Sequence, residues 1–331
     1  MKKPVIAFVT GGYSSEAVIS YQSAITIEKN IDCDLFDVYR IDITPERWFH
    51  SSDGGVQLDI DKNDFSLTLN GHKITFDAVL IGIHGTPGED GKLQGYFDLL
   101  GLPYSSCDAA TSAITFNKRY TCAIAGASGF NVSRSVLLFK NMVDAEIHKI
   151  RKMNFPLFVK PNNGGSSIGI SKVNQQEDLD QALEKAFKED NQVLVEEFIK
   201  GREFTIGVFK SEGKVVTLPI TEIISENDFF DFEAKYQGKS TEITPAKCDE
   251  EISNNVKSAA AAIYSLFNCN GVVRMDFIYN EAENRPYLLE INTVPGQSAA
   301  SIIPQQVAAA GLELKNFYSM LINNALASKK R

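Results

Sequence analysis

Residues 271–279 read GVVRMDFIY, and residues 285–292 read RPYLLEIN. Both runs are apolar and rich in β-branched or aromatic side chains, which is typical of strands in the core of a sheet. The connection at 280–284 is short, so we expect the two strands to pair antiparallel. The rest of the fold is predicted outward from this pair.

Polar side chains interrupt the two apolar strands with a period of two. Because side chains on a strand alternate between its faces, Arg274 shares a face with Asp276. Glu290 and Asn292 are related in the same way on the second strand. We expect Asp276, Glu290 and Asn292 to meet as three oxygen ligands of a hard cation such as Mg²⁺, with the arginine beside them. The alternative is a solvated sheet face, which is less favourable because unpaired charge in a core strand is costly.

Strands and helices alternate in the first third of the chain. Buried strands are predicted at 4–10, 35–41 and 77–85, and helices follow the first and the third of them. The stretch 51–76 is predicted to be an inserted hairpin, because Asn70-Gly71 is a signal for a type I′ turn. This alternation predicts an α/β unit with a doubly wound parallel sheet.

The remaining two thirds divide into two further units. A small α+β unit spans 155–199, and the final third contains more strands, including a single one at 213–224. Helices are predicted at 250–267 and 304–326. The long segment 225–245 is predicted to be a functional lid, because loops of that length are uncommon inside a compact domain. The predicted domains are 1–106, an N-terminal α/β domain, 107–198, a small central lobe, and 199–331, a C-terminal lobe with the metal site and the lid.

Composition and charge exclude several classes of protein. The chain has 331 residues and 36.5 kDa, with 33 basic and 42 acidic residues, a net charge of −9 and a pI near 5.1. This acidic balance argues against a nucleic-acid binder, and no apolar run is long enough to cross a bilayer. The five cysteines are scattered without a CxxC pair, which argues against a disulfide framework or a zinc site. We therefore expect a multidomain enzyme of the reducing cytoplasm.

A Gly/Ser-rich loop, KPNNGGSSIGIS at 160–171, lies between two predicted strands. Such a loop can turn its backbone N–H groups toward phosphate oxygens, and the hydroxyls of Ser166 and Ser167 add donors. Lys160, at the end of the preceding strand, can reach a phosphate as a point charge. The loop lacks the GxxxxGK[ST] pattern of a Walker A motif, and an ordinary glycine-rich hairpin is the alternative.

Two acidic residues end the next strand, in VLVEEFIKGREF at 193–204. Glu196 and the backbone of Glu197, Phe198 and Ile199 can face an adenine edge, and Glu203 can accept hydrogen bonds from ribose hydroxyls. The alternative is a solvated strand end without a ligand.

Four further candidates stand at the ends of predicted elements. Glu16 begins a helix, where the dipole favours a carboxylate. His84 ends a strand at the edge where open α/β sheets bind ligands. Gly296 lies in a turn that lets its N–H face a site, and Ser301 precedes a helix. Each of the four also has a purely structural interpretation.

Together and in this order, the motifs resemble the D-alanine–D-alanine ligases of the ATP-grasp superfamily. The similarity runs from about Val5 to Gly311, through GGYSSE, HGTPGEDGKLQGYFDLLGLPY, KPNNGGSSIGIS, DFEAKY, VRMDF and LEINTVPGQSAASIIP. It implies an N-terminal doubly wound parallel-sheet domain followed by a two-lobed ATP-grasp module.

The resemblance also implies a role for each candidate residue. It places ATP on Lys118, Lys160, Lys235, Ser166, Ser167, Glu196, Glu197, Phe198, Ile199 and Glu203. It places one Mg²⁺ on Asp276 and Glu290, and a second on Glu290 and Asn292, with Mn²⁺ as a substitute. It places the first D-alanine on Glu16 and His84, and the second D-alanine and the oxyanion on Arg274, Gly296 and Ser301. It further implies a hydrogen-bonded set of Glu16, Ser166 and Tyr236.

The implied reaction is ATP-dependent synthesis of D-alanyl-D-alanine through a D-alanyl phosphate, for peptidoglycan precursors, by a cytoplasmic homodimer. Within this resemblance, Tyr236 favours an amine as the second nucleophile. One departure from the family pattern is Ala300, which stands where a histidine is common. The alternatives are a D-alanine–D-lactate or other carboxylate–amine ligase and an inactive nucleotide-binding regulator. A dinucleotide-dependent oxidoreductase is disfavoured because the GxGxxG spacing is absent.

Overall fold

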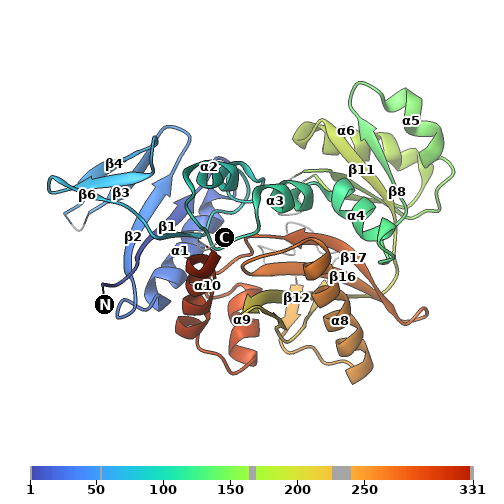
Figure 1. The fold of residues 1–331 in the computed structure, drawn as a ribbon. Coiled ribbons are helices and arrows are strands. Elements are labelled where there is room, and N and C mark those ends of the chain that lie inside the picture. The colour runs from blue at the N-terminus through green and yellow to red at the C-terminus, as the bar shows by residue number, and fades with distance from the viewer. Residues whose placement is uncertain (1, 53, 164–168, 226–239, 329–331) are drawn as a thin grey trace.

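The computed structural model describes residues 2–52, 54–163, 169–225 and 240–328. Three sheets follow one another along the chain, and helices pack on their faces (Figure 1). Within the described ranges, no helix is both long and apolar enough to span a bilayer.

The N-terminal sheet has the strand order β6-β5-β4-β3-β2-β1-β7. One end of it is parallel, because β1 pairs in parallel with both β2 and the edge strand β7, which confirms the predicted parallel layer. The expected hairpin is a meander of four antiparallel strands that continues the same sheet. The strands are β1 Val5–Gly11, β2 Asp37–Ile43, β3 Trp48–Ser51, β4 Gln57–Asp61, β5 Ser66–Leu69, β6 His72–Ile74 and β7 Ala78–Ile81.

Helices from both ends of the chain cover this sheet. Its two faces alternate along β1, where Phe8 joins one apolar cluster and Val9 another. The first cluster contains residues of α1 (Ala17–Asn30) and of the C-terminal α10 (Leu314–Ser328). The second contains residues of α2 (Lys92–Leu100). Figure 1 shows α10, in dark red, against the blue N-terminal elements, so the first and last parts of the chain share a core.

The central lobe is a four-stranded antiparallel sheet of order β10-β9-β11-β8, with α5 and α6 in its apolar cluster. Two short helices, α3 and α4, lead into it (Figure 1). The elements are α3 Ala109–Phe116, α4 Lys118–Ala127, β8 Ser135–Phe139, α5 Val143–Ile150, β9 Leu157–Pro161, β10 Ser171–Val173, the 3₁₀ turn η1 Gln176–Asp178, α6 Leu179–Glu189 and β11 Gln192–Glu197.

The C-terminal sheet has the order β15-β14-β12-β16-β17, and β13 pairs with β12. The predicted antiparallel pair is confirmed as β16 and β17, with a β-bulge between Asp276 and Phe277. The elements are β12 Arg202–Ser211, β13 Lys214–Thr217, β14 Thr221–Ser225, β15 Ser240–Ile243, α8 Glu250–Leu266, β16 Val273–Asn280, β17 Arg285–Asn292 and α9 Ile302–Ala309.

Several elements differ from the sequence prediction. The single strand expected at 213–224 is two strands, because Pro219 cannot continue the ladder. The single helix expected at 304–326 is α9 and α10, which are separated at Gly311, a residue with a φ of +73°. Strands β8 and β15 and helix α5 were not predicted.

Candidate active site

A cavity of about 410 Å³ lies between the N-terminal unit and the C-terminal sheet. Its walls come from the start of α1, the loop after β7, the α3–α4 junction, strands β12, β16 and β17, and the start of α9. Lys160 and the segment 196–199 lie outside this lining. The predicted site residues that line it are Glu16, His84, Lys118, Glu203, Arg274, Asp276, Glu290, Asn292, Gly296 and Ser301.

The acidic part of the cavity is built on three neighbouring strands. In the register of β16 and β17, Asp276 pairs with Glu290. Asn292 donates from Nδ2 to Oδ2 of Asp276 at 3.3 Å. Thr205, on β12, donates its hydroxyl to Oδ1 of Asp276 at 2.5 Å. Two carboxylates and an amide therefore lie side by side.

This donor set fits a hard divalent cation, because all its candidate ligand atoms are oxygens. Among the residues that the structure describes, no three His, Cys, Asp or Glu side chains are placed to hold a metal. The protein thus offers two carboxylates and one amide rather than a complete cage. Mg²⁺ is commonly held in this way, with phosphate oxygens and water completing its coordination.

Cationic side chains lie directly against these acids. Arg274 donates from Nε and from a terminal nitrogen to the two oxygens of Asp276, at 3.0 and 2.9 Å. The Nζ atom of Lys118 lies 3.6 Å from Oε2 of Glu290. Asp276 and Glu290 are therefore each paired with a cation before any ligand binds.

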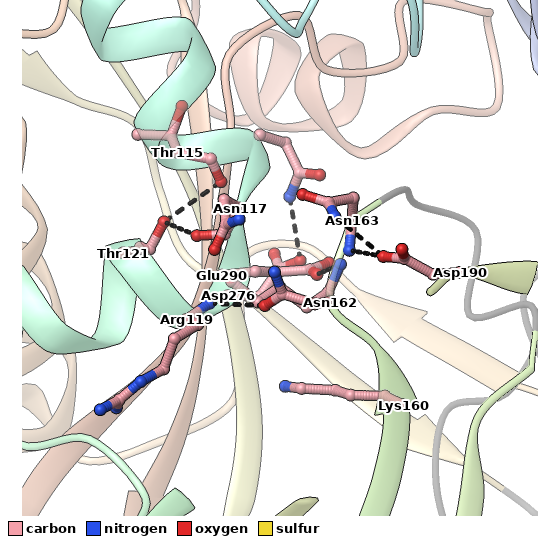
Figure 2. A network of polar contacts seen from close by, with 12 residues as sticks. Thr115, Asn117, Arg119, Thr121, Lys160, Asn162, Asn163, Asp190, Asp276 and Glu290 are labelled. Atoms are coloured by element: carbon pink, nitrogen blue, oxygen red, sulfur yellow. Dashed lines mark hydrogen bonds and ion pairs between the residues drawn. The ribbon is translucent and has the colours of Figure 1, made fainter. Parts of the chain in front are cut away.

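A second buried ion pair lies on the central lobe, where Nζ of Lys160 is 2.6 Å from Oε2 of Glu196. Burial works against the charged lysine, but the Glu196 carboxylate prevails and raises the pKa of Lys160 above its ordinary value. The Glu290 carboxylate contributes in the same direction. Lys160 is therefore a permanent positive charge near the acidic cluster, and Figure 2 shows it together with Asp276 and Glu290.

Asn162 connects the central lobe to the start of α4 (Figure 2). Its Oδ1 accepts from the N–H of Arg119 at 2.9 Å, and its carbonyl accepts from the N–H of Lys118 at 3.1 Å. Its Nδ2 donates to Gln192 on β11 at 3.0 Å. Asn162 is fully buried, so these contacts fix the distance between the backbones that carry Lys118 and Lys160.

The segment 196–199 uses part of its backbone within the protein. The N–H of Glu197 donates to the carbonyl of Arg134, and the N–H of Phe198 donates to the carbonyl of Pro156, both at 3.0 Å. The Phe198 ring lies 5.9 Å from the ring of Phe158, centroid to centroid. The segment thus has a fixed backbone next to an aromatic pair.

Glu16 is the N-cap residue of α1, as its place at the start of a helix led us to expect. Its carboxylate lies against the loop after β7: a methyl group on Gly85 would come within 2.5 Å of Oε2 of Glu16. Gly85 has a φ of +68°, which also favours glycine. The cavity thus has an anionic end formed by the N-terminal unit.

His84 is buried, and both its ring nitrogens have partners. Nδ1 donates to the carbonyl of Val294 at 2.7 Å, and Nε2 accepts from the hydroxyl of Ser23 at 2.9 Å. Burial lowers the pKa of His84 to about 4, despite the bond to Val294, and the nearby charge of Arg274 lowers it further. The imidazole is therefore neutral and carries its proton on Nδ1 at physiological pH.

Glu89, also in the cavity wall, was not singled out from the sequence. Its Oε2 accepts from the N–H of Gly85 at 2.7 Å, and its Oε1 accepts from the N–H of Val294 at 3.2 Å. Burial is the main cause that raises the pKa of Glu89, to about 8. The negative charge of the Glu16 carboxylate is the second cause. The residue belongs to the quoted stretch HGTPGEDG, so its proximity to His84 was a usable signal.

Gly296 and Ser301 face each other in another part of the cavity wall. A methyl group on Gly296 would lie 2.9 Å from Oγ of Ser301, which shares a 2.8 Å hydrogen bond with Oγ of Ser298. Ser301 is the N-cap residue of α9. This part of the cavity wall therefore combines a backbone turn, two hydroxyls and a helix start.

Thr205 and Glu242 are two further wall residues that sequence reasoning missed. Thr205 follows Glu203 by two positions on β12 and so shares its face, which was a readable signal. Glu242 accepts from Nε2 of Gln305 at 2.8 Å, and the same nitrogen donates to the carbonyl of Ala300 at 3.0 Å. No local motif marks Glu242, which reaches the wall only through the pairing of β15 with β14.

The predicted residues Ser166, Ser167, Lys235 and Tyr236 lie outside the described residues. The same holds for most of the segment expected to be a lid. Its two described ends are strands, since Ser225 on β14 pairs with Ser240 on β15.

Family comparisons match nearly the whole chain. The family model described as "D-ala D-ala ligase N-terminus" matches residues 5–107. The model described as "D-ala D-ala ligase C-terminus" matches residues 127–323. A D-alanine–D-alanine ligase of Phocaeicola vulgatus is 47% identical over 97% of this chain and 99% of its own length. The same enzyme of Flavobacterium johnsoniae is 45% identical over 97% and 99%.

Solved structures with this fold are also ligases. The VanG D-Ala:D-Ser ligase of Enterococcus faecalis has a TM-score of 0.89 and 31% identity, over 98% of this chain and 100% of that one. The D-alanyl-alanine synthetase A of Vibrio cholerae has a TM-score of 0.86 and 29% identity, over 99% of both. A D-alanine–D-alanine ligase of Bacillus anthracis, complexed with ATP, has a TM-score of 0.78 and 28% identity, over 99% of both.

Proposed function

Since the chain belongs to the D-alanine–D-alanine ligase family, we propose that it joins two D-alanines to D-alanyl-D-alanine with ATP as the energy source. The observation that carries the proposal is the single cavity in which the acids of β16 and β17, the cations beside them and the carboxylate of Glu16 face one another. A ligase needs all three, because it must hold a nucleotide, neutralise phosphate charge and bind an amino acid.

The nucleotide would lie between the central lobe and the C-terminal sheet. Lys118 would exchange its present carboxylate partner for phosphate oxygens, Lys160 would reach them from its ion pair with Glu196, and Ser166, Ser167 and Lys235 would add contacts there. Adenine and ribose would be held by the segment 196–199 and Glu203. Glu196, in its ion pair with Lys160, would keep that lysine directed at the phosphates.

Asp276, Glu290 and Asn292 would hold the divalent metal ions, two Mg²⁺ or Mn²⁺. Bound there, such ions supply positive charge to crowded phosphate oxygens. Arg274 stays beside them and limits the net negative charge of the cluster.

The two D-alanines would take opposite ends of the cavity. Glu16 would bind the ammonium of the first one, in the set with Ser166 and Tyr236, and His84 would form the neutral wall next to it. The second D-alanine would lie near Gly296 and Ser301, with its carboxylate close to Arg274.

The reaction has two steps. The carboxylate oxygen of the first D-alanine attacks the γ-phosphorus of ATP, so ADP leaves and an acylphosphate forms. The neutral amine of the second D-alanine then attacks the acyl carbon, and phosphate leaves from the tetrahedral intermediate. Arg274 and the N–H of Gly296 would stabilise the oxyanion, as such donors do in other acyl transfers.

The test is product analysis with ATP and Mg²⁺, offering D-alanine alone and together with D-lactate or D-serine. We expect D-alanyl-D-alanine as the main product, with one phosphate released per dipeptide. A main product of D-alanyl-D-lactate or D-alanyl-D-serine would assign a related ligase instead. ATP binding without any product would assign a regulator.

We also propose that the enzyme works in the cytoplasm, on peptidoglycan precursors, as a homodimer. All five cysteines are free, as in a reducing compartment. Val18 and Ile25, seven positions apart on α1, are 62% and 54% exposed, and a second copy would cover this apolar pair. Light scattering of the wild type and of Ile25→Asp tests the dimer: the variant is expected to be a monomer.

A further inference from the structure

The loop between β17 and α9 carries Gly296, and the N-terminal unit holds this loop on both sides. Before the glycine, the peptide groups of Val294 are bound twice: its N–H donates to Glu89 at 3.2 Å, and its carbonyl accepts from His84 at 2.7 Å. His84 and Glu89 thus bind a residue more than 200 positions away in the sequence.

After the glycine, the N–H of Gln297 donates to Oγ of Ser23 on α1 at 3.0 Å. The Ser23 hydroxyl in turn donates a hydrogen bond to Nε2 of His84. Ser23 is fully buried, so no water competes for these bonds. Gly296 therefore lies between two peptides that are each anchored to the N-terminal unit.

Glu89 joins this loop to the wall that holds Glu16. One of its oxygens accepts from Val294 and the other accepts from the N–H of Gly85, the residue against which the Glu16 carboxylate lies. A single carboxyl group thus connects the Gly296 loop to the wall that carries Glu16.

We propose that Glu89 and Ser23 are positioning residues, which hold the 294–297 loop so that the N–H of Gly296 points at the oxyanion of the reaction. The inference rests on the proposed function, in which that N–H is an oxyanion donor. Such a donor is effective only when its direction is fixed before charge develops. The competing role for Glu89 is a direct contact with the ammonium of a substrate.

Three substitutions separate these roles. Glu89→Gln keeps the shape but replaces one acceptor oxygen by an NH₂ group, so one of the two backbone N–H donors loses its acceptor. Ser23→Ala removes the acceptor of the Gln297 N–H. Asp77→Asn is the matched control: Asp77 accepts the backbone N–H of Val5 at 2.9 Å, and neither residue lines the cavity.

Steady-state kinetics give the first readout. Glu89→Gln and Ser23→Ala are each expected to lower kcat by about 10-fold or more, with the KM values for ATP and D-alanine within about 3-fold of wild type. The double variant should lose less than the product of the two losses, because both act on one loop. Asp77→Asn should keep wild-type kinetics. A loss confined to the D-alanine KM, or single variants within 2-fold of wild-type kcat, would overturn the proposal.

Amide hydrogen exchange gives a second readout that does not depend on activity. Peptides that cover 293–297 should exchange about 10-fold faster in Glu89→Gln and Ser23→Ala, while peptides from the C-terminal sheet stay unchanged. Unchanged exchange at 293–297 would refute the positioning role even in an active enzyme. Failure of the wild type to form dipeptide would instead refute the proposed function, and exchange would still decide the role of Glu89.

Discussion

Arg274 and Asp276 form a two-pronged ion pair on the same strand, with nitrogen–oxygen distances of 3.0 and 2.9 Å. They are two positions apart on β16, so the period of the strand alone brings them to one face. The pair occupies both oxygens of an acid that we assign to a metal ion. We therefore expect binding of the ion and nucleotide to redistribute contacts among Arg274, Asp276, Lys118 and Glu290, and we expect metal affinity to depend most on Glu290.

Glu290→Gln is expected to lower dipeptide formation by on the order of 10²-fold or more, since the amide keeps the shape but removes a charged ligand. Raising the Mg²⁺ concentration should recover part of the loss, and the melting temperature should stay near the wild-type value. Glu283→Gln is the control, because Glu283 lies on the exposed turn at the other end of the same hairpin, where it binds Arg285. Wild-type activity in Glu290→Gln would refute the metal assignment.

Gly296→Ala is expected to displace Ser301. The new methyl group would lie 2.9 Å from Oγ of Ser301, so the hydroxyl must move from its 2.8 Å bond with Ser298. We expect kcat/KM for D-alanine to fall by about 10- to 100-fold, because small displacements in a site are costly. Gly95→Ala on α2 should leave the kinetics unchanged, since its methyl group meets only Ala109 at 3.9 Å. Equal kinetics in the two variants would remove Gly296 and Ser301 from the site.

Asn162→Ala is expected to raise the KM for ATP by several-fold and to reduce stability by about 1–3 kcal/mol. The part-buried N–H of Arg119 would lose its acceptor, and the start of α4 would keep only the backbone bond from Lys118 to residue 162. Asn163→Ala tests the neighbouring position, whose side chain binds Asp190 rather than α4. An ATP KM that rises equally in both variants would argue for a general effect on the lobe.

His84 makes stability depend on pH in a defined direction. Its folded-state pKa is about 4, below the ordinary 6.5, so between these values the unfolded chain binds the proton that the folded protein excludes. Stability from this group is complete above pH 6.5 and is lost as pH falls, by about 2 kcal/mol at pH 5. Glu89 acts oppositely, because its raised pKa favours the folded state at lower pH.

Denaturant unfolding of the wild type and of His84→Gln between pH 5 and 7.5 isolates the histidine contribution. The stability difference between them should shrink by about 2 kcal/mol toward pH 5. A difference that does not change with pH would mean that His84 has the same pKa in the folded and the unfolded protein.

The sequence predicted much of this fold because its strands are apolar runs of the right length between clear turn signals. The pairing of β16 and β17 followed from a short connection, and the convergence of Asp276, Glu290 and Asn292 followed from the period of two. The hydrophobic pattern predicted one continuous element where a single residue divides it into two. Pro219 divides a strand, and Gly311 divides a helix.

The missed wall residues show a second limit. Glu89 takes its significance from Val294, which is distant in sequence, and Glu242 from a strand pairing that no motif announces. Both are ordinary acids in the sequence. Only tertiary contacts give them their partners, Val294 for Glu89 and Gln305 for Glu242.

The placement of α10 over the first sheet has a consequence for how the protein is made. The face of β1 that carries Phe8 is synthesised long before Phe317 and Ile322, which belong to the same cluster. The apolar face of β1 therefore stays without α10 until that helix has been synthesised. The cluster around Phe8 is complete only once α10 is present, so a chain cut short before residue 314 is expected to present that surface to chaperones and proteases.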